Sequence, residues 1–553
     1  MELARVFKDG MVLQRDIPIC IWGYSETSQT LTVRLNGEFV CEAKVTAGEF
    51  TIQFPAQSAM EDAVLEIGGI TLRHVDIGEV WVAGGQSNME FMLPFDQDGA
   101  SEITAANDPH LRTYIVGQYS YSGEREAGYK AWNPWDRWLP FTTEYAAELP
   151  AAAVYFAKEL RAKGVPVGIL SCNWGGTTAS AWTERRRLEA DPILRVYTDE
   201  FDQMAAGLDM TRYQAIRAAV RPALASPASQ AASQMLMKNT FHPSELQKKL
   251  AAQGSGNGSI FPVIPGIDPS TLTMEELMQE GPGDKNEPGA LFENMVIEIA
   301  GYTVRGVIWY QGESDEHHAG IYARLFRTMI ENWREAWVEK NTAQTRLPFL
   351  FVQLAPYGVW LDNTSENYPE LRRQQQAVAD TVPDTYMAAI GDVGNVYDIH
   401  PRAKRPVGRR LALLARKYIY HEAGLLADAP RAIRLERQAD TLRVYFANAD
   451  GLYLRSEGFS SYNGFPLDVI EPALRPPVLG GVGGLCVLTD GNPLAEAYCA
   501  VEKDTLVIRS EALTTAEQVT VEFAQTPFYQ VNLFNRSDIP ALPFRLIAKK
   551  ETL

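Results

Sequence analysis

The sequence has fewer basic than acidic residues, 51 Lys and Arg against 69 Asp and Glu, which gives a formal net charge of -18 and a pI near 5.0. A protein that holds nucleic acid or an anionic membrane needs an excess of Lys and Arg to neutralise phosphate groups. We therefore expect no nucleic-acid partner and no membrane partner. The acidic balance says little about a neutral or sugar-like substrate.

Cysteine is also scarce, with five residues that show no paired metal-ligand spacing: Cys20, Cys41, Cys172, Cys486 and Cys499. This count and spacing exclude a disulfide-rich scaffold and a zinc ribbon. Neighbouring strands could bring Cys20 and Cys41 together, although nothing local requires it. Cys172 follows an apolar run, and we expect it to be a packed strand residue rather than a reactive thiol.

Long apolar runs are absent, since none reaches the roughly 18–20 residues of a membrane-spanning helix. The first residues, MELARVFKDGMVLQRDIP, lack the basic head and apolar core of a signal peptide. If the sequence begins at the native start, these absences predict a cytoplasmic protein. A trimmed form of a secreted protein would show the same pattern.

The sequence is long enough for several domains, each with its own hydrophobic core. Its 553 residues, of which 46% are hydrophobic, correspond to roughly two to four globular domains. Residues 1–76 hold short alternating segments such as QTLTVRL and GEFTIQF, which predict an antiparallel β-sandwich domain. Asn36-Gly37 is typical of a tight hairpin turn. The β pattern returns in DTLRVYFAN and EQVTVEFAQT and predicts a second β domain over residues 428–553.

Residues 77–427 have a different rhythm. Short apolar segments, including EVWVAGG, PVGILSCNWGG and RGVIWYQGE, alternate with helical patterns such as YARLFRTMIENWREAWVEK. This alternation predicts an α/β domain with a parallel sheet covered by helices on both faces. Active sites of such sheets lie beyond the carboxyl ends of the strands. Residues 185–288 fit the rhythm poorly, and we expect them to form a mainly helical insertion beside a binding cleft.

Two predicted strand ends carry a nucleophile and oxyanion donors. In AGGQSNM, Ser87 would begin a helix, with its own N–H directed into the site. In NWGGT, Gly175 and Gly176 leave backbone N–H groups uncovered, which suits a second donor. An α/β-hydrolase elbow would need glycines two residues before and after the serine; Gly85 fits this pattern, but Met89 does not.

Two further strand ends add an amide and a base. WYQGESD supplies the Gln311 amide and the Glu313 carboxylate, and DIHP supplies the His400 imidazole with Asp398 two residues before it. Each segment alone is more typical of an ordinary loop. Together, in successive strand–helix units, they are the groups that acyl transfer through a covalent serine intermediate requires.

These segments resemble those of a known family. GQSNM, NWGGT, WYQGESD and IHP look like the four ordered blocks of the sialate O-acetylesterase-like carbohydrate esterases of the SGNH hydrolase superfamily. FKDGMVLQRDIPICIWG and VNLFNRSDIPALPFR resemble segments of the flanking β domains, so the resemblance covers nearly the whole chain apart from much of the helical insertion. It implies an SGNH-type, flavodoxin-like core, a parallel sheet sandwiched between helices, with flanking all-β domains.

Carried over by position, the resemblance implies that Ser87 is the nucleophile and His400 the base. The wider SGNH pattern has an aspartate three residues before the histidine, where this chain has Tyr397. Asp398 is the predicted acid that orients His400. The alternatives are Asp392, Glu313 or a backbone carbonyl.

The resemblance also implies an oxyanion hole made of the Ser87 N–H, the Gly176 N–H and the Gln311 side chain, with Gly175 as the alternative to Gly176. Residues next to these groups are predicted to bind substrate, with bracing of the loop as the alternative for Asp315: Gln86, Asn88, Trp174, Glu313 and Asp315.

GESDEHH concentrates five metal-binding residue types: Glu313, Asp315, Glu316, His317 and His318. Neighbouring side chains diverge in strands and helices alike, so we expect neither a metal nor a cofactor. Several aromatic residues near the strand ends are candidates for stacking on a sugar, with core packing as the alternative for each: Trp174, Trp182, Trp309, Tyr310 and Tyr357. A sialate carboxylate would favour an arginine, and the candidates are Arg305, Arg372 and Arg402.

The resemblance therefore implies a serine esterase that removes acetyl groups from an acetylated mono- or oligosaccharide, with sialate O-acetylesterase activity first. An acetylxylan, xyloglucan or mannan oligosaccharide esterase is the second hypothesis. A non-catalytic carbohydrate-binding protein is a third, of another class. We expect activity to fall as the pH drops through about 6–7, because a protonated imidazole cannot accept the serine proton. Nothing in the sequence indicates an oligomeric state.

Overall fold

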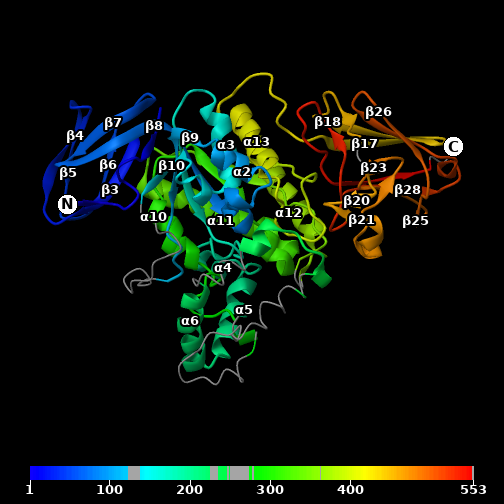
Figure 1. Cartoon of the computed structure of the whole chain (residues 1–553), viewed down its shortest axis with the longest axis horizontal. Coiled ribbons are helices and arrows are strands. Elements are labelled where there is room, and N and C mark those ends of the chain that lie inside the picture. The colour runs from blue at the N-terminus through cyan, green and yellow to red at the C-terminus, as the bar shows by residue number, and fades with distance from the viewer. Residues whose placement is uncertain are drawn as a thin grey trace. The chain divides into compact units, whose positions relative to one another are not determined.

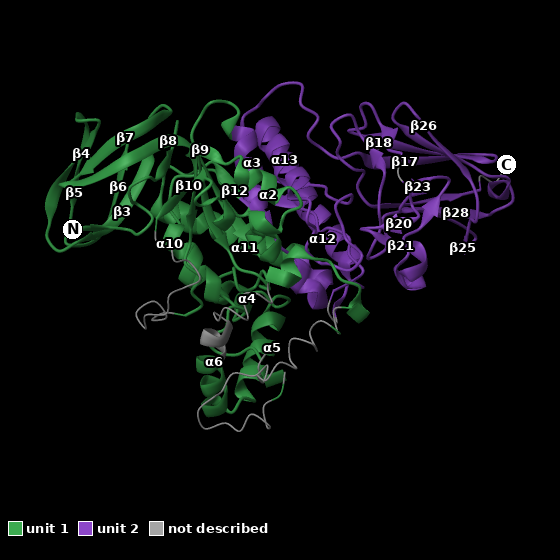
Figure 2. Cartoon of the chain, in the orientation of Figure 1, with its two compact units in different colours: residues 1–150, 161–307, 323–347 green, residues 151–160, 308–322, 348–553 purple. Residues whose placement is uncertain are grey.

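The computed structural model describes residues 1–121, 137–224, 234–245, 248, 273, 275–276, 279–360, 363–456 and 458–550. The chain divides into two compact units (Figure 2). Unit 1 comprises Met1–Pro150, Arg161–Val307 and Ala323–Leu347, and unit 2 comprises Ala151–Leu160, Ile308–Tyr322 and Pro348–Leu553.

The first residues of unit 1 form antiparallel β structure (Figure 1). One sheet has the order β1-β3-β6, and β4 pairs with both β5 and β7. The strands are β1 (Glu2–Leu3), β3 (Ile19–Ser25), β4 (Gln29–Leu35), β5 (Glu38–Val45), β6 (Gly48–Phe54) and β7 (Met60–Ile67). Asn36 and Gly37, at the β4–β5 turn, have φ values of 52° and 81°, as a type I′ turn requires. The predicted hairpin is confirmed.

The longest strand, β8 (Ile70–Gly85), belongs to both patterns seen in the sequence. Its first part pairs antiparallel with β7, whereas its last residues, from Glu79 on, pair in parallel with β11 (Val167–Asn173). The strand order continues from β8 through β11 to β9 (Asn107–Ile115) and β10 (Trp138–Thr142), and β2 (Val12–Gln14) lies parallel beside β8. β11 is buried along its whole length, as expected of a parallel strand covered on both faces.

The helices of unit 1 bury aromatic residues. Trp333, on α11 (Tyr322–Lys340), donates its indole N–H to the Trp182 carbonyl at 2.9 Å and stacks on Trp337. The other described elements of this unit are short helices: α1 (Ser87–Glu90), η1 (Leu93–Phe95), α2 (Gly99–Thr104), η2 (Ala146–Glu148), η4 (Phe292–Val296) and α10 (Ile297–Ile299). The predicted insertion contains α4 (Arg185–Ala190), α5 (Arg195–Ala206) and α6 (Met210–Leu224), and much of its remainder lies outside the described residues.

The first part of unit 2 is α/β. β13 (Phe349–Val352) pairs in parallel with β16 (Thr385–Ala388), and α12 (Tyr368–Thr381) and α13 (Lys404–Leu414) pack against these strands. α13 also lies close to α3 (Ala151–Arg161), because a Cβ at Gly408 would lie 2.6 Å from the Phe156 nitrogen. The remaining elements here are β14 (Val359–Trp360), β15 (Asn363–Thr364), η5 (Glu313–Ile321) and η6 (Ala415–Ile419). β12 (Gly306–Tyr310) begins in unit 1 and ends in unit 2.

The last part of unit 2 is all-β. Two antiparallel sheets, β17-β18-β27-β26 and β25-β24-β28-β30, share one core to which Val444, Val487, Leu506 and Val521 contribute. Their strands are β17 (Arg431–Gln438), β18 (Thr441–Ala447), β24 (Leu485–Thr489), β25 (Asn492–Pro493), β26 (Tyr498–Glu502), β27 (Thr505–Arg509), β28 (Gln518–Phe523) and β30 (Phe544–Lys549). Short elements fill the connections: β19 (Tyr453–Leu454), β20 (Ser461–Tyr462), β21 (Phe465–Pro466), η7 (Leu467–Val469), η8 (Pro472–Leu474), β22 (Val478–Leu479), β23 (Val482–Gly483), η9 (Glu511–Leu513) and β29 (Leu533–Phe534).

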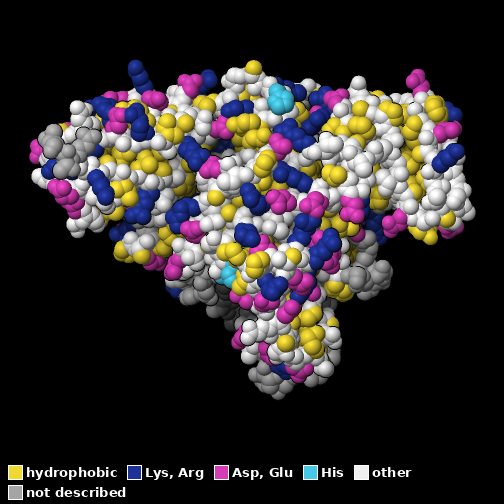
Figure 3. Space-filling model, turned by 180° about the vertical axis from the view of Figure 1, so that it is seen from behind, with side chains coloured by type: hydrophobic (Ala, Val, Ile, Leu, Met, Phe, Trp, Pro, Cys, Tyr) yellow, Lys and Arg dark blue, Asp and Glu magenta, His cyan; other side chains and the backbone are white. Residues whose placement is uncertain are grey.

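The chain is thus a mixed α/β protein with a large mixed sheet and additional all-β regions. The domain boundaries at residues 76–77 and 427–428 stay a prediction, and β8 runs through the first of them. All five cysteines are free thiols; Cys172 is buried in β11, and burial raises the pKa of its thiol. In the part of the chain that the structure describes, every helix is too short or too polar to cross a bilayer. Acidic and basic side chains are interspersed on the face seen in Figure 3.

Candidate active site

Ser87 lies at the carboxyl end of β8. Gly85 has a φ of 132°, in the region that favours glycine, and lets the chain turn sharply out of the strand. The Gln86 carbonyl accepts the N–H groups of Met89 and Glu90 at 2.9 and 3.0 Å, so α1 begins at Ser87 as predicted. This helix is a single turn, which leaves little room for a macrodipole. Gln86 and Asn88 are buried, and Ser87 is half-buried between them.

The glycine segment after β11 lies against Ser87. The parallel register pairs Asn173 with Gly85, and the Trp174 N–H donates to the Gly85 carbonyl at 3.1 Å. A Cβ added at Gly175 would lie 3.2 Å from the Ser87 Cβ, so any side chain there would press on the serine. Within unit 1, two of the predicted strand-end segments therefore meet at one edge of the sheet.

The hydrogen bonds of this glycine segment distinguish between the two predicted backbone donors. The Gly175 N–H donates to the Glu90 Oε2 at 2.6 Å, so a carboxylate already occupies it. Gly176 is exposed, with a φ of 70°, and its carbonyl accepts the Asn286 side-chain amide at 3.0 Å. These contacts favour the Gly176 N–H as the oxyanion donor.

Two charged residues at this turn were missed in the sequence. Glu90 lies three residues after Ser87, one helical turn away, and that spacing is a signal that could have placed it near the nucleophile. Lys285 donates its ammonium to the Gly175 carbonyl. It lies within the interval assigned to the helical insertion, where no local pattern marks it. Burial lowers the Lys285 pKa, and the carboxylates of Asp284, Glu90 and Glu280 oppose that shift.

In unit 2, Gln311 is fixed by buried partners. Its Nε2 donates to the Asp315 Oδ2 at 2.5 Å, and its Oε1 accepts the Tyr322 hydroxyl at 2.9 Å. These two contacts assign the amide orientation, with nitrogen toward Asp315. Gly312, with a φ of 144°, makes the turn that separates Gln311 from η5. Asp315 is fully buried and Glu313 nearly so, and the contact of Asp315 is one that braces Gln311.

His400 is 5% exposed and lies beside Asp398. Its Nδ1 is 3.3 Å from the Asp398 Oδ1, and the same oxygen accepts the His400 backbone N–H at 2.8 Å. The indole of Trp360 packs edge-on against the imidazole, with ring centroids 5.0 Å apart. Asp398 is therefore well placed to orient the ring.

One of the alternative acids, Asp392, is engaged elsewhere. Asp392 is paired with Arg410 through two bonds of 2.6 and 2.8 Å. Tyr397, which occupies the family's aspartate position, donates its hydroxyl to Glu471 at 2.7 Å and packs edge-on against Phe465. Tyr397 thus serves packing with the β region that follows, while Asp398 supplies the carboxylate at His400.

Most of the aromatic and arginine candidates are structural. Trp182, Trp309, Tyr310 and Tyr357 are buried, and Trp174 alone among the five aromatic candidates is half-exposed. Arg305 donates to Glu79 at 2.9 Å, and Arg372 is buried and donates to the Thr526 carbonyl at 2.6 Å. Arg402 is half-exposed. Among these aromatic candidates, Trp174 is therefore the one that is accessible for stacking on a sugar.

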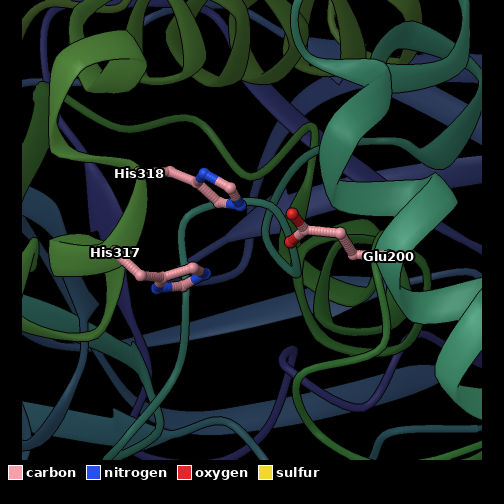
Figure 4. Close-up of side chains that lie close together, drawn as sticks. All are labelled: Glu200, His317 and His318. Carbon is pink, nitrogen blue, oxygen red and sulfur yellow. The ribbon is translucent and has the colours of Figure 1, made fainter.

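The stretch GESDEHH directs its acidic side chains to different partners, whereas its two histidine rings lie together. The ring centroids of His317 and His318 lie 4.3 Å apart and the ring planes are tilted by 48°. Figure 4 shows both rings together with Glu200. Asp315 is directed instead to Gln311, and Glu316 accepts the Asn367 N–H at 2.9 Å. Glu200 belongs to unit 1 and both histidines to unit 2, and we assign no metal to the three.

Each unit therefore carries part of the predicted machinery. Unit 1 brings Ser87 together with Gly175 and Gly176, and unit 2 brings His400 together with Asp398 and Gln311 with Asp315.

The chain is similar to known carbohydrate esterases. Residues 276–417 match the family model of carbohydrate esterases described as sialic acid-specific acetylesterase. The sialate O-acetylesterase of Mus musculus is 26% identical over 468 residues, 79% of this chain and 76% of the relative, and that of Homo sapiens is 23% identical over the same number of residues. A carbohydrate acetylesterase from Xanthomonas citri of known structure is 27% identical, has a TM-score of 0.66, and is aligned over 99% of both chains.

Proposed function

The chain is related to the sialate O-acetylesterases and to a bacterial carbohydrate acetylesterase. We therefore propose that it hydrolyses O-acetyl esters of carbohydrates and that O-acetylated sialic acid is its preferred substrate. It is a carboxylic ester hydrolase in this proposal. The observation that carries the proposal is the placement of Ser87 at the carboxyl end of β8 against the Gly175–Gly176 turn. A serine there has backbone donors beside it, as acyl transfer requires.

In the proposed reaction, the Ser87 Oγ attacks the acetyl carbonyl carbon while His400 accepts the hydroxyl proton. Since Nδ1 faces Asp398, Nε2 is the basic nitrogen. The carbonyl oxygen becomes an oxyanion held by the N–H groups of Ser87 and Gly176 and by the Gln311 amide. The C–O bond to the sugar then breaks, and the sugar oxygen leaves with the proton from His400. Water, deprotonated by His400, hydrolyses the acetyl-serine and releases acetate.

The order of these residues also supports a finer proposal about the fold. We propose that the parallel strands belong to an SGNH-type, flavodoxin-like core, with Gln86 and Asn88 packed behind the nucleophile and Trp174 at the substrate. Gln86 and Asn88 are buried on both sides of Ser87, which suits a role in holding the turn.

Acetate release tests the function directly. Wild-type protein and Ser87→Ala are compared on O-acetyl sialic acid and on acetylated xylo- and manno-oligosaccharides, with Ser101→Ala as the control. Ser101 is exposed and donates its hydroxyl to the Asp98 carbonyl, away from the proposed site, so we expect its loss to leave activity intact. We expect Ser87→Ala to lose at least about 10³-fold in kcat, because no nucleophile remains.

The substrate panel separates the alternatives. Faster release from acetylated xylo- or manno-oligosaccharide than from O-acetyl sialic acid would replace sialate by a plant glycan. No acetate from any substrate, together with sugar binding that Ser87→Ala leaves unchanged, would identify a carbohydrate-binding protein instead.

A further inference from the structure

Gly175 is held by charged groups at both its carbonyl and its N–H. Lys285 donates its ammonium to the Gly175 carbonyl oxygen, and on the other side of this residue the Gly175 N–H donates to the Glu90 carboxylate at 2.6 Å. A Cβ at Gly176 would lie 3.0 Å from the Lys285 Nζ, so the ammonium packs directly against the turn. Two glycines in sequence would otherwise leave this peptide free to rotate.

The two charged residues are themselves held in place. The Gln118 amide donates to the Glu90 Oε1 at 3.0 Å and to the Asn173 carbonyl at 3.1 Å, which ties Glu90 to the end of β11. Near Lys285, Arg217 donates to Asp284 at 2.6 Å, and Asn286 donates to Glu280 at 2.6 Å. The Asn286 amide also donates to the Gly176 carbonyl, so the segment that carries Lys285 is bonded to the same turn twice.

The geometry of a peptide bond links Lys285 to the oxyanion donor. The Gly175 carbonyl and the Gly176 N–H belong to one planar unit, and in a trans peptide they point in opposite directions. No described peptide bond of the chain is cis. By holding the carbonyl, Lys285 therefore directs the Gly176 N–H to the opposite side. A cation on the carbonyl also polarises the peptide and makes its N–H a stronger donor.

We propose that Lys285 and Glu90 are positioning residues that clamp the Gly175 residue from both sides and so keep the Gly176 N–H aimed as the oxyanion donor. This inference rests on the proposed esterase function. An ammonium beside the site could instead bind a substrate carboxylate. The surroundings favour the clamp, because Asp284, Glu90 and Glu280 surround Lys285 and would repel an anion.

The test measures kcat and KM for 4-methylumbelliferyl acetate, an ester without a sugar. An oxyanion donor acts on the transition state, so we expect Lys285→Met to lower kcat roughly 10- to 100-fold and to change KM by less than about twofold. Lys285→Arg keeps a charged donor and retains most of the rate. Lys340→Met is the matched control, since Lys340 is also a partly buried lysine that donates to a backbone carbonyl, Ile297, at 2.8 Å. It leaves kcat unchanged.

The pH profile adds a readout that a purely structural role would not move. Burial lowers the Lys285 pKa, and the charged groups that face it are Asp284, Glu90, Glu280 and Arg217. The clamp is fully charged below that lowered pKa and loses its positive charge as the pH rises through it. We therefore expect wild-type kcat to decline at alkaline pH. Lys285→Arg moves that decline to higher pH, because a guanidinium stays protonated there.

The outcomes separate this inference from the function on which it depends. If Ser87→Ala abolishes acetate release but Lys285→Met keeps the wild-type kcat, the clamp is overturned and the esterase stands. A rise in KM for O-acetyl sialic acid alone, with kcat unchanged, would assign Lys285 to substrate binding instead. Should Lys285→Met fail to fold, Glu90→Gln gives the same test from the other side of the clamp, again as a loss of kcat at constant KM. If wild type releases no acetate, the proposed function itself fails.

Discussion

At the scale of single residues, the space beside the nucleophile decides which side chain is tolerated. A Cβ at Gly175 would lie 3.2 Å from the Ser87 Cβ and 3.1 Å from the Glu90 Oε2, and both are closer than ordinary packing allows. Gly175→Ala must therefore displace the serine by a few tenths of an ångström or more. We expect kcat to fall about 100-fold, since small misplacements of reacting groups are that costly.

The control for Gly175→Ala is Gly458→Ala, because no atom of the described residues lies within 4 Å of a Cβ at Gly458 and its backbone needs no glycine. Thermal unfolding is measured for both variants, and we expect the two unfolding temperatures to stay close to wild type. If Gly175→Ala keeps full kcat, Ser87 is not the nucleophile or the turn is not part of its site.

The acid beside His400 gives a second prediction at this scale. Asp398→Asn replaces an acceptor at Nδ1 by an amide that can donate, which favours the wrong imidazole tautomer for a base at Nε2. We expect kcat to fall about 10²- to 10⁴-fold at neutral pH with little change in unfolding temperature. Asp392→Asn is the control, since it weakens the pair with Arg410 and should lower stability while the folded enzyme keeps its kcat. The reverse pattern would assign the orienting role to Asp392.

At the scale of secondary-structure elements, the β4–β5 hairpin tests whether the turn is specified locally. Gly37 has a φ of 81° and open space around it among the described residues. Gly37→Ala therefore meets no clash, and its cost is the conformational free energy of an alanine at positive φ. We expect a loss of about 1–2 kcal/mol in the free energy of unfolding, read from the denaturant midpoint. Gly320→Ala, also in open space but without a positive φ, should be neutral. Equal effects of the two substitutions would show that the turn conformation does not matter.

The sequence predicted secondary-structure elements and the ends of strands better than other features of the structure. Parallel strands end at a common edge, so the apolar runs before Ser87 and before Gly175 placed these residues side by side without any structure. The domain boundary predicted at residues 76–77 falls inside β8, which is one continuous strand. In the structure, a Cβ at Gly78 would lie 2.0 Å from the Pro166 carbonyl, so this glycine serves close approach and not a turn.

What the sequence could not show are contacts made by residues distant along the chain. Lys285 contacts Gly175 across 110 positions of the sequence, and no local period or spacing encodes such a pair. Burial is a second limit, because Trp182 and Trp309 follow glycine-rich or apolar segments just as an exposed sugar platform would. The structure places both in the core, where their environment and not their residue type decides their role.

At the scale of the whole molecule, the net charge of -18 sets the long-range field that a substrate meets. Sialic acid carries a carboxylate, so an acidic protein repels it during diffusion, and salt screens that repulsion. Acidic and basic side chains alternate over the face in Figure 3. Among the arginine candidates, Arg305 and Arg372 are already hydrogen-bonded within the protein.

We expect kcat/KM for O-acetyl sialic acid to rise roughly two- to tenfold as salt increases from about 0.01 M to about 0.3 M. The value for acetylated xylo-oligosaccharide, which is uncharged, should stay constant. A decrease with salt for the sialate alone would mean that a local positive field outweighs the overall charge, and the search for a carboxylate-binding residue would then turn to Arg402.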